Sequence, residues 1–308
     1  FYAKPMPENS FTLPSFAKIN WFLRVLGKRA DDFHELCTIF QTVSLCDNLT
    51  FSSCDRIILT CDDERIPIGE ENLIVRAANV LRQKYGIGTG ARIRLEKNIP
   101  SPGGLGGGSS NAAIALLGLT ALWDIKTNLN ELIEIGGKIG SDVPFFFYGG
   151  TAAGIGRGTE ITPLNDLREK FVLIVTPGVD VSTADAFAHL NASRLTKEAS
   201  KSILQICLSE AETLDLRHTE LKNDFEASVF AAAPEIKRVK EKLIELGAIK
   251  AGMSGSGASV FAVFEKEETR QTAQKATREN DWRSFAVATV SRDEYREALK
   301  KVFRFASD

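Results

Sequence analysis

The chain contains few of the residues that would hold a metal cage, and no segment long enough to cross a membrane. Its 308 residues include three histidines and an odd number of cysteines, five, with no CxxC motif or Cys/His cluster. No apolar stretch approaches the roughly 20 residues that a bilayer requires. Lys and Arg form no clustered run, and the formal net charge is −2. We therefore expect no nucleic-acid and no membrane partner, and thiols in a reducing cytoplasm.

The composition is that of an ordinary globular protein, with 44% hydrophobic and 25% charged residues. A chain of this length favours two domains, which we place at residues 1–167 and 168–308. Strand and helix patterns are mixed without strict alternation, which predicts an α+β fold and argues against a doubly wound sheet. The pattern leaves open whether the protein is a monomer or a homodimer.

Period-two and helical patterns predict the elements. The predicted strands cover residues 16–26, 37–45, 49–52, 56–61, 91–96, 170–175, 259–264 and 285–290. The predicted helices cover residues 73–85, 112–123, 129–139 (with a break at Gly136-Gly137), 225–232, 234–246, 268–279 and 293–303. Residues 149–161 are glycine-rich and are predicted to form strand and turn.

The most informative segment is PSPGGLGGGSSN, residues 100–111, which has five glycines in six positions between a strand and a helix. Glycine admits positive φ and brings backbone N–H groups close to a ligand. A helix that begins there adds unpaired donors and a partial positive charge. The segment matches neither a Walker A motif nor the G-x-G-x-x-G spacing. We predict that it binds the phosphates of ATP rather than serving as a linker. The predicted ATP-binding residues are Pro100, Gly103, Gly104, Leu105, Gly106, Gly107, Gly108, Ser109, Ser110 and Asn111.

Two hydroxyl side chains, Ser109 and Ser110, close this loop. Either hydroxyl could bond a phosphate oxygen or ligate Mg²⁺. The alternative is that one of them caps the helix while the other touches the ligand.

Two charged residues stand in apolar surroundings elsewhere. Lys18 lies in a β-prone segment, where a lone lysine usually points to solvent. Asp142 lies between a predicted helix and the aromatic run Phe145–Tyr148, where it could simply cap a turn. Together with a phosphate loop, however, a lysine and an aspartate make a phosphoryl-transfer set, in which the carboxylate takes the proton of the acceptor hydroxyl.

Three segments in this order resemble the motifs of the GHMP kinase superfamily: Ser15–Asn20, Pro100–Asn111, and Ala251–Phe261 with its Gly255-Ser256-Gly257 core. Within it, Arg29–Leu36, Glu71–Ala78 and Gly140–Phe146 resemble the branch that acts on a cytidine-diphosphate-linked polyol. The resemblance implies a two-domain fold with the active site in the cleft, ATP and Mg²⁺ as cofactors, and phosphorylation of the polyol's 2-hydroxyl.

The resemblance also implies roles for single residues. Asp142 would be the general base, and Lys18 would bond both the base and the acceptor hydroxyl. Phe33 and Phe187 would sandwich the cytosine, with His34 at its polar edge. The other residues implied in substrate binding are Asn20, Thr183 (a weaker candidate), Gly255, Ser256 and Gly257. Asn72 matches a position near the adenosine, and its alternative role is helix N-cap.

Three positions depart from the family pattern. Phe16 replaces a usual Pro, Phe33 replaces a common Tyr but keeps a stacking face, and Pro102 replaces Gly. Pro102 cannot donate to a phosphate, which predicts an altered loop entrance with ATP binding retained. The alternatives left open are another GHMP kinase, of homoserine or mevalonate type, and a non-catalytic nucleotide-binding module.

Overall fold

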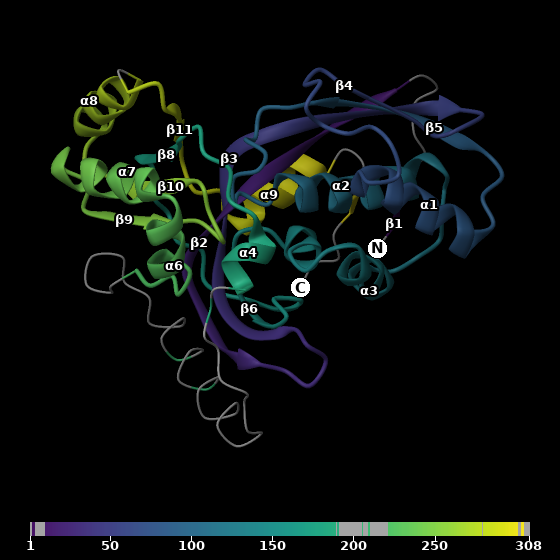
Figure 1. Ribbon diagram of the computed structural model, residues 1–308. Helices are drawn as coiled ribbons and strands as arrows, with labels where there is room; N and C mark the ends of the chain where they lie inside the picture. Colours follow the sequence, from purple (N-terminus) through teal and green to yellow (C-terminus); the bar gives the residue numbers. More distant parts are fainter. Residues whose placement is uncertain are drawn as a thin grey trace.

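The computed structural model describes residues 2–3, 10–188, 190, 205, 209, 221–278, 280–300 and 303–304 (Figure 1). It consists of a larger sheet at one end, a smaller antiparallel sheet at the other, and helices packed on both. The predicted α+β fold is therefore confirmed. Among these residues no helix combines the length and apolarity that a membrane span needs.

The larger sheet has the strand order β4-β5-β3-β6-β7, with β2 paired to β3. Its strands are β2 (Phe11–Lys28), β3 (His34–Cys54), β4 (Ile58–Cys61), β5 (Gly90–Glu96), β6 (Thr151–Gly156) and β7 (Glu160–Pro163). The long strand β3 pairs first with β6 and then with β5. The two short strands predicted at 37–45 and 49–52 are thus one strand.

The smaller sheet has the order β11-β8-β10-β9. Its strands are β8 (Val172–Thr176), β9 (Lys250–Met253), β10 (Val260–Val263) and β11 (Arg283–Val287). A separate pair joins the ends of the chain, β1 (Tyr2–Ala3) with β12 (Phe303–Arg304).

Each predicted helix is present, but the helix predicted at 293–303 ends at Leu299, and Phe303 lies in β12 instead. The described helices also include two that the sequence analysis does not predict, at 143–147 and 183–188. The described helices are α1 (Leu73–Tyr85), α2 (Gly107–Leu122), α3 (Leu129–Ile139), the 3₁₀ helix η1 (Val143–Phe147), α4 (Thr183–Ala188), α6 (Glu226–Ala232), α7 (Pro234–Glu245), α8 (Glu267–Arg278) and α9 (Arg292–Leu299). Helix α2 begins five residues earlier than predicted, inside the glycine run. Helix α3 is not broken at Gly136.

Three groups of apolar side chains hold the fold together. One lies between the larger sheet and α1, α2 and α3, and another between the smaller sheet and its helices. Helix α2 is apolar on all sides and buried, as expected of a central helix. The third group joins the two sheets, with Trp21 of β2 packed edge-on against Phe261 of β10 at 5.1 Å between ring centroids. This shared core fixes the first glycine loop (residues 100–111) relative to the second, which contains Gly255-Ser256-Gly257.

Candidate active site

A cavity of about 790 Å³ lies between the two glycine-rich segments. It is lined by the β2 residues Lys18 and Asn20, the turn after β2, the first glycine loop, Asp142, and parts of the smaller sheet's domain. Most of the residues that the sequence singles out therefore meet in one place. Asn72, Ser110 and Asn111 do not line this cavity.

Lys18 and Asp142 face each other in this cavity. The Lys18 Nζ lies 3.4 Å from Asp142 Oδ2, and Lys18 is only 3% exposed. The ammonium group also donates to Asn20 Oδ1 at 2.6 Å and to the carbonyl of Gly104 at 2.9 Å. The general expectation that a lone strand lysine points to solvent is wrong here. Because three oxygen atoms surround the buried ammonium, its position relative to the carboxylate is fixed.

Asn20 holds Lys18 in place. Its Oδ1 accepts from Lys18, and its Nδ2 donates to Thr38 Oγ1 at 2.7 Å. Thr38 in turn donates to the Phe22 carbonyl at 2.7 Å. Both ends of the Asn20 amide are thus used within the chain, although the residue lines the cavity.

Asp142 is positioned by an unusually close contact between α3 and η1. A Cβ at Gly136 would lie 2.8 Å from Val143 Cγ1 and 2.9 Å from the Phe147 ring. Only glycine at this position lets η1 pack directly on α3. This close approach explains why a glycine stands at position 136, inside the continuous helix α3. From the other side, the Tyr295 hydroxyl of α9 donates to the Phe146 carbonyl, and burial raises the pKa of Tyr295.

The first glycine loop wraps around Lys18 and meets the second loop. The Leu105 carbonyl accepts from the Lys18 backbone N–H at 2.9 Å. Gly104 has φ +69°, and a Cβ there would lie 2.1 Å from the Ser254 carbonyl oxygen. The Ser254 hydroxyl donates to the Gly104 carbonyl at 2.9 Å. Gly104 is therefore the point where the two loops touch, and no other residue fits there.

Helix α2 begins at Gly107, with Gly106 at φ +68° as its N-cap and no side-chain capping bond. The interpretation that a serine caps this helix is wrong, because both serines lie within its first turns. The first N–H groups of the helix have no intrahelical acceptor and carry the positive end of its dipole. A Cβ at Gly108 would meet nothing nearer than 3.9 Å, so open space adjoins these donors.

The structure separates the two serines. Ser109 is half-buried and lines the cavity. Ser110 is fully buried, and its Oγ lies 2.7 Å from Ser15 Oγ, which is also 2.7 Å from Asn111 Oδ1. The side chains of Ser110 and Asn111 thus attach α2 to strand β2, and of the two serines Ser109 is the one at the cavity.

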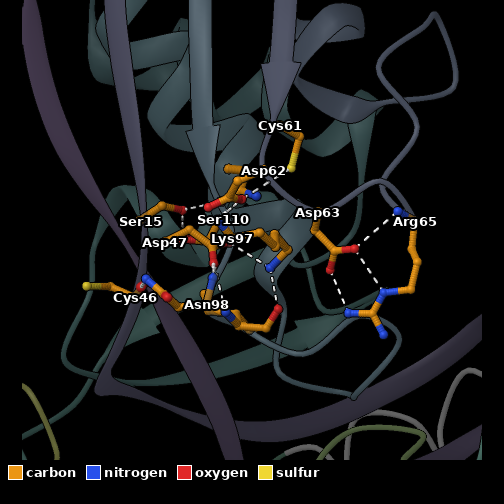
Figure 2. Close-up of polar contacts among 12 residues, drawn as sticks. Ser15, Cys46, Asp47, Cys61, Asp62, Asp63, Arg65, Lys97, Asn98 and Ser110 are labelled. Carbon is orange, nitrogen blue, oxygen red and sulfur yellow. Dashed lines mark hydrogen bonds and ion pairs between the residues drawn. The ribbon is translucent and has the colours of Figure 1, made fainter.

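A buried ion pair that the sequence analysis missed lies beneath the same loop (Figure 2). Lys97 Nζ lies 2.8 Å from Asp47 Oδ2, and the two side chains are almost wholly buried. Asp47 Oδ1 accepts from the backbone N–H groups of Asn98 and Ile99 at 2.7 and 2.8 Å. Lys97 also donates to the Ile99 carbonyl. Asp47 therefore fixes the segment that connects β5 to the glycine loop.

Asp47→Asn is expected to lower the free energy of unfolding by about 3–5 kcal/mol, because it leaves the Lys97 ammonium buried without a counter-charge. The double variant Asp47→Asn/Lys97→Met should recover part of this loss. Urea denaturation measures both. Asp124→Asn is the control, since it removes an exposed ion pair with Lys126 and should change stability by less than about 1 kcal/mol. Equal effects of Asp47→Asn and Asp124→Asn would contradict this account.

Aromatic side chains line the other end of the cavity. The His34 and Phe187 rings stack at 5.0 Å between centroids, and Phe187 meets Phe225 edge-on at 4.7 Å. Burial, with a smaller contribution from Lys28, lowers the pKa of His34, so the imidazole is neutral near pH 7. The ring that stacks on Phe187 is His34 and not Phe33. Phe33 instead has the Arg157 guanidinium on its face.

The remaining predicted site residues are divided between the cavity and the framework. Thr183 and Ser256 lie in the cavity wall with their hydroxyl oxygens 2.9 Å apart, and Gly255 and Gly257 line it as well. Asn72 is the N-cap of α1, because its Oδ1 accepts from the Ile74 N–H at 2.9 Å and its Nδ2 donates to the Pro67 carbonyl. The alternative prediction for Asn72, that it is a helix N-cap, is therefore confirmed.

The glycine loop, Lys18 and Ser109 all line the cavity. In the part of the chain that the structure describes, no group of three or more His, Cys, Asp or Glu residues could hold a metal ion.

Family models match two parts of the chain. Residues 72–150 match the GHMP kinases N terminal domain, and residues 199–282 match the GHMP kinases C terminal model. A homoserine kinase from Cytophaga hutchinsonii, with a TM-score of 0.71, 20% identity and coverage of 94% of this chain and 97% of the other, has the same fold. The two family models and this fold, together with the glycine loop and the Lys18–Asp142 pair, define the class. The protein is a GHMP kinase, an ATP-dependent small-molecule kinase.

Relatives across nearly the whole chain define the family more closely. A 4-diphosphocytidyl-2-C-methyl-D-erythritol kinase from Solibacter usitatus is 41% identical and covers 94% of this chain and 92% of that relative. One from Geobacter metallireducens is 39% identical over 91% of this chain and 99% of the relative. A solved 4-(cytidine 5'-diphospho)-2C-methyl-D-erythritol kinase superposes with a TM-score of 0.73 at 32% identity, over 91% of this chain and 99% of the other. The chain therefore belongs to the 4-diphosphocytidyl-2-C-methyl-D-erythritol kinase family.

Proposed function

We propose that the chain transfers the γ-phosphoryl group of ATP to the 2-hydroxyl of 4-diphosphocytidyl-2-C-methyl-D-erythritol, a step in the non-mevalonate isoprenoid pathway. The observation that carries the mechanism is the contact of Lys18 Nζ with Asp142 Oδ2 at 3.4 Å beside the first glycine loop. Asp142 accepts the proton of the acceptor hydroxyl, and Lys18 orients the carboxylate and offsets the charge that develops during transfer. Phosphoryl transfer depends on such positioning and charge stabilisation.

In this proposal each end of the cavity holds one substrate. The N-terminus of α2 and residues 103–108 hold the ATP phosphates, and Ser109, whose hydroxyl lies at the cavity, is the serine that meets Mg²⁺. Ser110 and Asn111 contribute by fixing α2. Mg²⁺ supplies charge neutralisation on the phosphates when bound.

The aromatic end holds the cytidine. Neutral His34 can accept a hydrogen bond from the cytosine amino group, and the ring faces of Phe33 and Phe187 supply stacking surface. Since the His34 and Phe187 rings stack at 5.0 Å, one of them must move before a base can stack on that face of Phe187. Thr183 and Ser256 supply hydroxyl groups, and Asn20 acts through Lys18.

Residues 1–167 form most of the ATP-binding part and residues 168–308 complete the acceptor pocket. Tyr295 and Leu299 of α9 pack into the core of the first part, although α9 lies within residues 168–308. The thiols of Cys46, Cys54 and Cys61 are not in disulfides, which is consistent with a reducing cytoplasm.

The test is ADP release from ATP and Mg²⁺ with 4-diphosphocytidyl-2-C-methyl-D-erythritol, beside homoserine and mevalonate. We expect turnover with the cytidine substrate alone. Turnover with another acceptor would retain the kinase and overturn the acceptor pocket. ATP binding without transfer to any acceptor would favour a non-catalytic nucleotide-binding module.

Phe187→Ala is expected to raise KM for the cytidine substrate about 5- to 150-fold, the equivalent of one lost base stack, and to leave KM for ATP near its wild-type value. Initial rates at varied concentrations of each substrate measure both constants. Phe230→Ala is the control, because Phe230 is a half-buried phenylalanine of the same core that does not line the cavity. A selective rise in KM for ATP would contradict the assignment of the aromatic end of the cavity to the cytidine.

A further inference from the structure

Arg157, which the sequence analysis passed over, lies in the tight turn between β6 and β7. It stands between Gly156 at φ +69° and Gly158 at φ +87°. The pairing of Leu36 with Gly156 brings this turn beside the turn that joins β2 to β3, where Phe33 lies. Two turns that are more than 120 positions apart in the chain therefore place Arg157 and Phe33 together at the cavity wall.

The Arg157 guanidinium lies over the accessible aromatic ring of Phe33. Its central carbon is 3.5 Å from the ring centroid, and Phe33 is 47% exposed. This distance is typical of a cation–π contact, so the guanidinium covers one face of the Phe33 ring.

The guanidinium keeps unused hydrogen-bonding capacity. Its Nε is buried and has no hydrogen-bond partner among the described residues. An arginine has five N–H donors, and within the described part of the chain none of those on Arg157 donates to a carboxylate or carbonyl group. The carboxylates of the neighbouring turn have other cations: Asp32 lies 2.9 Å from Lys28, and Asp31 and Glu35 contact Arg29.

A buried donor without an acceptor costs free energy unless a ligand supplies the acceptor. A ligand that carries anionic oxygens close to the aromatic end would supply the acceptor, and a planar guanidinium matches phosphate oxygens well. We propose that Arg157 binds the diphosphate that links the cytidine to the polyol, and that it thereby selects a nucleoside-diphosphate-linked acceptor over an uncharged one. This inference rests on the proposed function, since the cytidine must occupy the aromatic end.

The experiment compares CDP, which carries the diphosphate, with cytidine, which lacks it. Isothermal titration calorimetry measures both dissociation constants while a non-hydrolysable ATP analogue saturates the nucleotide end. The variants are Arg157→Met, Arg157→Lys, and Arg92→Met as a control on the exposed face of β5. We expect Arg157→Met to weaken CDP about 10- to 150-fold, as for a lost hydrogen bond to a charged group, and to leave cytidine within about twofold of wild type. Arg157→Lys should recover part of the CDP affinity.

The outcomes separate the two claims. If the wild-type protein binds both ligands and Arg157→Met binds CDP as tightly as wild type, the role of Arg157 is overturned and the cytidine pocket stands. Equal weakening of CDP and cytidine would show that Arg157 only shapes the pocket, which also overturns the proposal. If the wild-type protein binds the ATP analogue but neither cytidine ligand, the proposed acceptor falls, and the role of Arg157 with it.

Discussion

Replacing Asp142 by asparagine is expected to lower kcat about 10²- to 10⁴-fold while the dissociation constant for ATP stays near its wild-type value. The amide keeps the size of the side chain but cannot accept the proton of the acceptor hydroxyl. Loss of a general base corresponds to roughly 3–5.5 kcal/mol of activation barrier. The pair geometry supports this role, since Lys18 Nζ lies 3.4 Å from the carboxylate and is itself held by Asn20 and Gly104.

Steady-state ADP release and titration of ATP by calorimetry measure the two quantities. Asp55→Asn serves as the matched control, because it makes the same chemical change at an exposed turn outside the cavity. An Asp142→Asn protein that turns over at the wild-type rate would remove Asp142 from the role of base. A large loss of ATP affinity would instead assign it to nucleotide binding.

Gly104→Ala is expected to lower kcat/KM by about 10²-fold or more. The left-handed conformation at φ +69° costs about 1–2 kcal/mol for any L-residue with a side chain. The larger effect comes from the new Cβ, which would lie 2.1 Å from the Ser254 carbonyl oxygen and would push the two loops apart. The Gly104 carbonyl accepts from both Lys18 and Ser254, so its displacement moves the Lys18 ammonium from Asp142. Displacements of about 1 Å have effects of this size on reacting groups.

Two further glycines are the controls for this variant. Gly88→Ala places a Cβ in open space on an exposed turn and should behave as wild type. Gly108→Ala also meets no protein atom nearer than 3.9 Å, so it should fold normally and raise KM for ATP by occupying space at the helix N-terminus. Wild-type kinetics of Gly104→Ala would show that the contact between the loops is not needed for catalysis.

Several elements could be predicted because their causes are local. Helix α1 is capped at its start by the Asn72 side chain and at its end by the left-handed Gly86. Both capping residues adjoin the helix in the sequence. The glycine run predicts a phosphate loop on equally local grounds, and phosphate binding there stays a prediction. The start of α2 was misplaced by five residues, because glycine weakens the helical pattern although the backbone there is already helical.

Other features of the site depend on contacts between distant segments. From the sequence, Gly136 is predicted to break a helix. The structure shows that Val143 and Phe147 occupy the space that a Cβ at this position would take. Ser109 and Ser110 are equivalent in sequence, and only the packing of α2 against Ser15 of β2 turns one hydroxyl inward and the other toward the cavity.

By itself the sequence determined the α+β class, the glycine loop and the two charged residues that are proposed for phosphoryl transfer, because residue type and spacing limit what a backbone and a side chain can do. Only the tertiary structure decided which groups meet. It buried Asp47 against Lys97 across about 50 positions, stacked His34 on Phe187, and laid Arg157 on Phe33. Such pairings follow from the register of β3 with its neighbours and from the core that joins the two sheets, and no local pattern encodes them.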